Sequence, residues 1–160
     1  MGMASVRDFF EADHDRLDAL FIEFQTLKRK DYPAAKENFK LFLKGLTRHI
    51  VWEEDVLFPL FEEKTGMQGM GPTAVMRQEH RVIKGHLDAL HEKVRAADPE
   101  SDDEENALLH VLKDHNMKEE EILYPAIDQS LEAGELEKVE KAMAAIPEER
   151  YACCCHAHPG

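Results

Sequence analysis

Residues 49–59 read HIVWEEDVLFP, and residues 115–125 read HNMKEEEILYP. The second stretch repeats the first at a spacing of 66 residues, with His, Glu and Pro at the same three places. Residues four apart share one face of a helix, so His49 lies beside Glu53, and His115 beside Glu119. Both polar pairs interrupt sequences that otherwise suit a buried core.

The repeat extends to two further histidines, because His14 and His80 are also 66 residues apart. Each interrupts a stripe of apolar residues spaced three and four apart. Four helices therefore each turn one His inward, and two of them add a Glu one turn later. This pattern indicates two helical hairpins related by an approximate two-fold axis.

The same periodicity predicts the fold class, since no convincing alternating strand pattern occurs. We expect an all-α protein, an antiparallel up-down four-helix bundle with a short C-terminal fifth helix and a loose tail. The expected helices span about 5–29, 33–63, 73–96, 102–129 and, for the short one, 135–145.

Two prolines fall inside the second and fourth expected helices. Pro59 and Pro125 each remove a backbone hydrogen bond and are expected to kink or end their helix locally. Past the Glu of each motif, the apolar stripes are expected to continue at Val56 and Leu60 and at Ile122 and Ala126.

The 160 residues suit one domain with a single core, which we expect to span residues 1–150. Residues 151–160 form a Cys/His-containing tail. Cys153 to Cys155 are adjacent, which excludes a disulfide framework. The tail could bind a soft metal or serve redox chemistry, but without CxxC spacing a flexible tail is favoured.

The formal net charge is −13, from 33 acidic against 20 basic residues. Such an acidic surface argues against nucleic acid and anionic membranes as partners, because both need basic residues. The first ten residues, MGMASVRDFF, lack the long apolar stretch typical of a signal peptide, and no apolar run is long enough to span a membrane. We expect a cytoplasmic protein, either a monomer or a homodimer.

The expected turns set the depth of the four histidines. The points halfway between consecutive histidines lie near residues 31, 64 and 97, each at a turn that Pro, Gly or acidic loop residues indicate independently. The histidines should therefore form one layer across the bundle, joined by the two carboxylates: His14, His49, Glu53, His80, His115 and Glu119.

Two buried carboxylates without a cation would carry a large desolvation cost, so a metal site is favoured over a hydrogen-bonded network. Four imidazoles and two carboxylates without a thiolate suit Fe, Mn, Zn or Co. Six ligands are too many for one tetrahedral zinc. Two metals bridged by Glu53, Glu119 and a solvent-derived oxo or hydroxo group would use every ligand and leave one open position each.

The spacing of these residues, with LFP and LYP after the two motifs, resembles that of the hemerythrin-like (HHE cation-binding) family over roughly residues 8–128. The resemblance implies a non-haem di-iron centre that meets O2, NO or peroxide, with His14, His49, Glu53, His80, His115 and Glu119 as ligands. Manganese or zinc are possible substitutes for the two iron ions.

One departure from the family concerns the third helix. Oxygen-carrying hemerythrins have a fifth His at the position of Lys84, and His86 faces elsewhere. The four-His, two-Glu set instead resembles iron–sulfur cluster repair proteins and an iron-sensing ubiquitin-ligase subunit, although this chain lacks the repair proteins' N-terminal cysteine-bearing domain. Ferritin-like proteins would need Glu-x-x-His twice, but Arg77 stands where the second Glu should be.

Three functions stay open at this point. The first is a di-iron protein that binds or senses O2, NO or peroxide. The second is an enzyme that repairs iron–sulfur clusters or turns over NO or peroxide, and the third is a structural or storage metal module. Lys84 is expected to face solvent. Most of the acidic residues that follow the two Glu ligands are also expected to be surface charges, although one or two could orient a ligand imidazole: Glu54, Asp55, Glu120 and Glu121.

Overall fold

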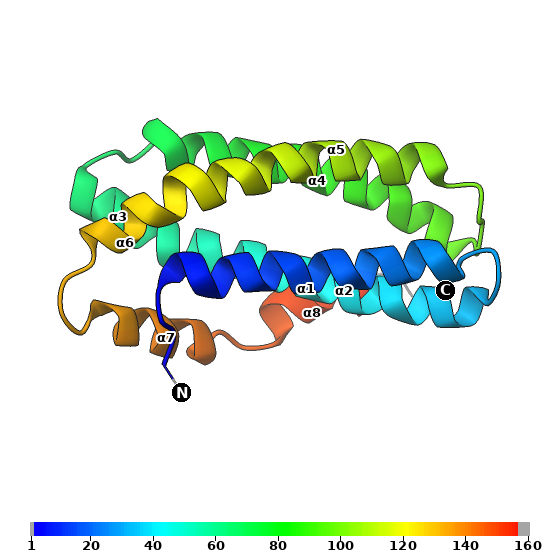
Figure 1. Cartoon of the computed structure of the whole chain (residues 1–160), viewed down its shortest axis with the longest axis horizontal. Coiled ribbons are helices and arrows are strands. Elements are labelled where there is room, and N and C mark those ends of the chain that lie inside the picture. Colours follow the sequence, from blue (N-terminus) through cyan, green and yellow to red (C-terminus); the bar gives the residue numbers. More distant parts are fainter. Residues whose placement is uncertain (1, 157–160) are drawn as a thin grey trace.

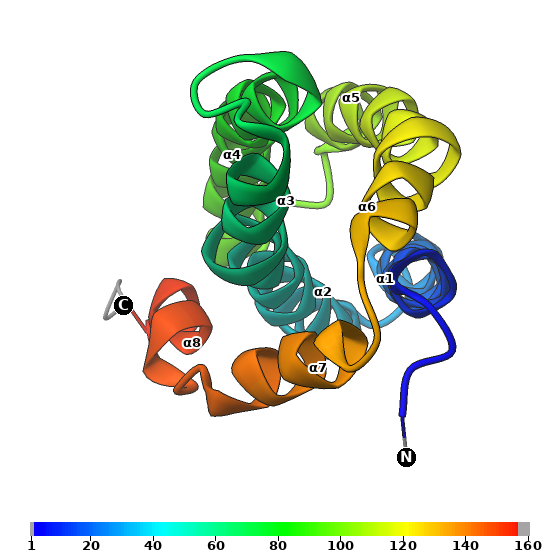
Figure 2. The same ribbon diagram turned by 90° about the vertical axis from the view of Figure 1, so that its left-hand side faces the viewer.

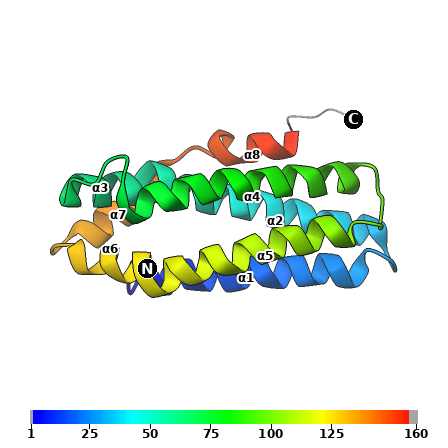
Figure 3. The same cartoon turned by 90° about the horizontal axis from the view of Figure 1, so that it is seen from above.

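The computed structural model describes the backbone of residues 2–156 and the side chains of residues 2–152. Four long helical segments lie side by side with alternating direction (Figures 1 and 3). They are α1 (Val6–Leu27), α2 (Tyr32–Trp52) prolonged by α3 (Phe58–Thr65), α4 (Gly71–Arg95), and α5 (Asp102–Lys118) prolonged by α6 (Tyr124–Ser130). The predicted all-α antiparallel bundle is confirmed.

Two π-helical turns join the parts of the second and fourth segments, η1 (Glu53–Leu57) and η2 (Glu119–Leu123). In each, a backbone N–H bonds five residues back, from Phe58 to Glu53 and from Tyr124 to Glu119. The prolines follow directly. A proline ring in an α-helix clashes with the carbonyl four residues before it, and the wider turn relieves that clash. The helices therefore continue instead of ending.

Each π turn adds one residue, so the inward face advances by one position. The expected stripe at Ile122 is wrong: Ile122 is 61% exposed, whereas Leu123 is 1% exposed. Val56 and Leu60 are likewise only half-buried. The buried positions past the two Glu residues are instead Leu57, Phe58, Phe61, Leu123, Tyr124 and Ile127.

The apolar core forms two clusters, one on each side of the predicted polar layer. The first cluster includes Leu17, Phe42, Leu87 and Leu108, toward the ends that carry the α1–α2 and α4–α5 loops. The second surrounds Phe10, Leu57, Phe58, Met76, Leu123 and Tyr124. Both clusters are aromatic-rich and fix the helices on either side of the layer.

Further contacts hold the bundle near its two ends. The helix α7 (Glu135–Ala145) lies outside the four helices, on the side of α1 and α2 near α3 and α6, and buries Val139 and Met143 against the second cluster (Figure 2). At the opposite end, the buried ammonium of Lys28 pairs with Asp102 and with Glu105, which lies 2.5 Å away.

The segment expected as a loose tail is helical in part. The helix α8 (Glu149–His156) packs on α2. Arg150 binds Asp55 at 2.5 Å, and Lys44 pairs with Glu148 just before α8 begins. Residues 157–160 and the side chains of Cys153–Cys155 lie outside what the structure describes.

Candidate metal centre

The six predicted ligands meet in the bundle interior, where each is at least 96% buried. His14 comes from α1, His49 from α2, His80 from α4 and His115 from α5, while Glu53 and Glu119 open the two π turns. The imidazole rings pair across each hairpin, with centroids 4.6 Å apart for His14 and His49. The rings of His80 and His115 lie 4.9 Å apart.

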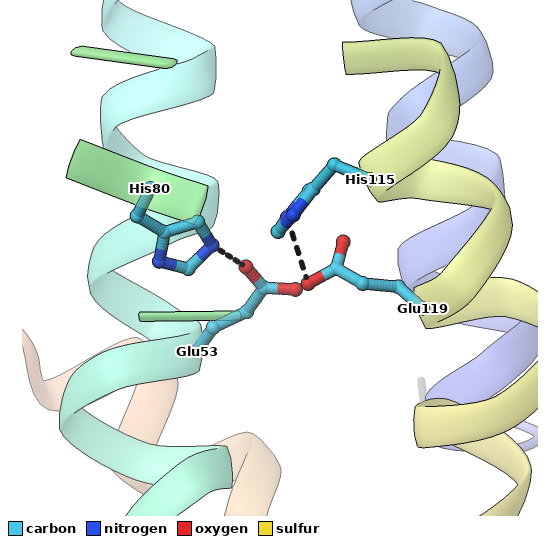
Figure 4. A group of neighbouring side chains, drawn as sticks. All are labelled: Glu53, His80, His115 and Glu119. Atoms are coloured by element: carbon cyan, nitrogen blue, oxygen red, sulfur yellow. Dashed lines mark ion pairs between the residues drawn. The ribbon is translucent and has the colours of Figure 1, made fainter. Parts of the chain in front are cut away.

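Their donor atoms divide into two groups, in each of which all atoms lie within 4.8 Å of one another. One group holds four donors, from Glu53, His80, His115 and Glu119 (Figure 4). The other holds three, from His14, His49 and Glu119. Glu119 thus belongs to both groups, whereas Glu53 meets the distance criterion in the four-donor group only, although its Oε2 also lies 3.4 Å from His49 Nε2. The two positions are less alike than the sequence repeat suggests.

Three buried polar atoms in the four-donor group lack a hydrogen-bond partner: Glu53 Oε1, His80 Nε2 and Glu119 Oε2. Glu53 Oε1 approaches His80 Nε2 to 3.0 Å, but without hydrogen-bond geometry. Buried polar atoms left without partners are costly. Atoms that converge in this way suit a shared cation, so the residues present fit a metal.

Each imidazole is fixed from behind by a carboxylate on a neighbouring helix. His14 Nδ1 donates to Glu120 at 2.6 Å, and His49 Nδ1 donates to Asp13 at 2.8 Å. In the other hairpin, His80 Nδ1 donates to Glu54 at 2.6 Å, and His115 Nδ1 donates to Glu79 at 2.9 Å. The four bonds form a closed ring around α1, α2, α4 and α5. Because Nδ1 donates outward, the lone pair of every Nε2 can face the centre.

Sequence reasoning allowed Glu54 and Glu120 an orienting role, but it missed Asp13 and Glu79. A signal was present, since Asp13 and Glu79 are themselves 66 residues apart and each directly precedes a ligand histidine. The repeat therefore includes the orienting carboxylates as well as the predicted ligands.

Tyr124 is a further residue of the centre that sequence reasoning missed. Its buried hydroxyl lies 2.5 Å from Glu53 Oε2 and 2.8 Å from Glu119 Oε1. Tyr124 belongs to the LYP that follows the second motif, and only the π turn brings it to the inward face.

The carboxylates control the protonation of the imidazoles in the absence of a cation. Burial disfavours a charged His49, but the charge of Glu53 and the hydrogen bond to Asp13 outweigh burial and raise the pKa of His49 to about 10. Burial similarly opposes a charged His80, yet the close carboxylates of Glu53 and Glu54 outweigh burial and raise the pKa of His80 to about 9. The centre attracts positive charge.

A cavity of about 310 Å³ between α2 and α4 borders His80, one residue of the four-donor group. Its lining includes His80 and Glu54 together with Lys84 and aliphatic side chains. Lys84 is the position of the fifth histidine in oxygen carriers. Its ammonium is directed to solvent, as the sequence indicated, and it pairs with Asp88 at 3.1 Å.

The remaining described histidines take no part in either donor group. His86 is half-buried and His110 is exposed, while the ring of His91 packs 5.7 Å from Phe39, far along the bundle.

The four-helix bundle, with four histidines and two glutamates turned inward, has the features of a helical metal-binding protein. The family model of the hemerythrin HHE cation-binding domain matches residues 5–127. The chain therefore belongs to the hemerythrin HHE family.

Relatives in that family carry several names. The chain is 29% identical to an uncharacterised hemerythrin-like protein of Schizosaccharomyces pombe, over 78% of this chain and 66% of the relative. It is 24% identical to the iron–sulfur cluster repair protein YtfE of Escherichia coli, over 73% and 60%. A DNA nickase of Nostoc is 28% identical over 84% of this chain but only 36% of its own length. No solved structure matches.

These relatives are longer than the matched region, since the chain spans between 36% and 66% of their lengths. Among the residues that the structure describes, no helix has both the length and the apolar character needed to cross a membrane.

Proposed function

We propose that the centre holds two iron ions with an oxo or hydroxo bridge, and that the protein binds or senses O2, NO or peroxide there. The observation that carries the proposal is that six buried residues direct their donor atoms toward one another in two groups. Three of these atoms have no hydrogen-bond partner. Bound iron would supply redox chemistry and an open coordination position. Manganese or zinc would fit the same donors with less of that chemistry.

The protein's own residues hold the donors and admit the small ligand. The four carboxylates behind the imidazoles fix the tautomer and the ring orientation, and Glu119 ties the two positions together. The cavity beside His80 gives a small ligand a route to the four-donor side.

A second candidate is iron–sulfur cluster repair or turnover of NO or peroxide, favoured by the similarity to YtfE. A structural or storage role with zinc is the third candidate. The cytoplasmic location, the monomeric or dimeric state and the exclusion of nucleic acid and membrane as partners stay predictions from the sequence.

Metal analysis and absorption spectra separate these functions. We expect close to two irons per chain and the near-ultraviolet absorption of an oxo-bridged ferric pair, which dithionite removes. A spectral change on adding NO or O2 to the reduced protein would support binding, and catalytic consumption of peroxide would favour an enzyme. Stoichiometric zinc that iron cannot replace would overturn the di-iron proposal.

Substitution of the two glutamates tests the donor groups. Because Glu119 belongs to both groups, Glu119→Ala should lose both irons, whereas Glu53→Ala should lose mainly the iron of the four-donor group. His86→Ala is the control and should keep the iron content of the unmodified chain. Equal losses in Glu53→Ala and His86→Ala would show that the assigned centre is wrong.

A further inference from the structure

The two halves of the centre differ at one pair of positions related by the 66-residue repeat. Phe58 occupies the position in the first half that Tyr124 occupies in the second, and both side chains are fully buried. Phe58 stacks on His80 with ring centroids 5.7 Å apart and planes at 12°. Tyr124 leans on His14 at 5.9 Å and 31°, so the two rings occupy related places. Only one carries a hydroxyl.

That hydroxyl lies among atoms that we assign as metal ligands. Besides the two carboxylates at 2.5 and 2.8 Å, the Tyr124 oxygen is 3.2 Å from His49 Nε2 and 3.5 Å from His14 Nε2. Three of these four atoms belong to His14, His49 and Glu119, which are the three residues of the three-donor group. The phenol therefore stands beside the group that is one donor short.

The distances are those expected of neighbouring ligands on one ion. With metal–nitrogen and metal–oxygen bonds of about 2.0–2.2 Å, adjacent donors at right angles are about 3 Å apart. The Tyr124 oxygen is 2.8–3.5 Å from its three neighbours in that group. The hydroxyl can donate only one hydrogen bond, yet four nitrogen and oxygen atoms of the centre lie within 3.5 Å of its oxygen.

We propose that the Tyr124 oxygen is the fourth protein ligand of the metal bound by His14, His49 and Glu119. On binding, the new oxygen–metal bond replaces the O–H bond, and the proton is released to solvent. The inference rests on the proposed metal centre. It makes the two metals chemically different and leaves the four-donor position, next to Phe58 and the cavity, as the one that receives an external ligand.

Spectroscopy of the full chain loaded with iron tests this ligand directly. Ferrous iron is added to the metal-free protein without oxygen and then oxidised with ferricyanide. We expect a visible charge-transfer band from tyrosinate to ferric iron, with enhanced phenolate ring vibrations in the resonance Raman spectrum. Tyr124→Phe should abolish both signals while keeping most of the iron, whereas the matched control Tyr32→Phe should keep both.

The first measurement needs only the unmodified chain, so the result does not depend on how well Tyr124→Phe folds. Close to two bound irons without phenolate vibrations would overturn the inference and leave the metal centre intact. Phenolate signals that survive in Tyr124→Phe would also overturn it. A chain that binds no iron would refute the proposed centre itself, and the inference with it.

Discussion

Asp13 and Glu79 each hold one ligand imidazole in place from outside the donor layer. Asp13 accepts from His49 and is itself held by Arg16 at 2.9 Å. Glu79 accepts from His115 and pairs with Lys118. These basic partners keep the carboxylates charged and in place, and the pKa of both is lowered even though burial opposes it.

Removal of either carboxylate should weaken metal binding. Asp13→Ala and Glu79→Ala each leave an Nδ1–H without its acceptor, and we expect metal affinity to fall by about 10–100-fold. Competition against a chelating dye measures the change. Asp15→Ala is the control, because Asp15 is exposed and should leave affinity unchanged. The orienting role would be refuted if all three variants bound metal equally.

The π turns η1 and η2 matter at the scale of the helix. Each turn begins at its Glu and contains one residue more than an α-helical turn. The inward-facing positions that follow are therefore shifted by one residue along the sequence. Without the insertion, Leu123 and Tyr124 would lose their inward positions to Ile122. The turn therefore gives the centre its tyrosine as well as a glutamate.

Stability measurements on neighbouring positions test the shifted face. Leu123→Ala removes a side chain that is 1% exposed and should lower the free energy of unfolding by about 2–5 kcal/mol. Ile122→Ala, at 61% exposure, should change it by no more than about 0.5 kcal/mol. Urea denaturation of the metal-free variants gives both values. The reverse order would mean that the helix is α-helical throughout.

The shift at these turns also marks the limit of what the sequence could predict. The 66-residue repeat and the positions of the loops place six residues in one layer, and the structure brings them together. A 3.6-residue period holds for a continuous α-helix, so it fails once a residue is inserted. Pro59 and Pro125 marked the two places, but a proline alone indicates a kink, an end or a wider turn equally well.

The orienting carboxylates and Tyr124 escaped prediction for a different reason. Whether an acidic residue beside a ligand faces solvent or a neighbouring imidazole depends on how two helices pack. Asp13 and Asp15 both lie next to His14, yet only Asp13 faces α2. The position of α8 on α2 likewise depends on tertiary contacts such as the pair of Arg150 and Asp55.

The whole molecule combines a net charge of −13 with carboxylates concentrated at its centre. Protonated imidazoles balance part of that charge when no metal is bound. The pKa of His49 is about 10 and that of His80 about 9, against about 6.5 in an unfolded chain. Between about pH 6.5 and the raised pKa values of about 9 and 10, the folded state therefore binds more protons than the unfolded state.

The stability of the metal-free protein should consequently depend on pH. A raised pKa stabilises the fold fully below about pH 6.5, and this contribution is lost as the pH rises through about 9 to 10. We expect the melting temperature of the metal-free protein to fall across that range. The metal-loaded protein is the control, because its imidazoles are neutral ligands and should not titrate there. Parallel curves for both forms would contradict the expectation.

The sharing of glutamates between the hairpins has a consequence for assembly. Glu119 extends from the second hairpin to the histidines of the first, and Glu53 extends from the first to those of the second. Each hairpin alone supplies the two histidines of one donor group but lacks the Glu from the other hairpin that completes that group. Metal uptake during refolding should therefore begin only after the hairpins have docked. The rate at which metal binds would then report the rate of this last folding step.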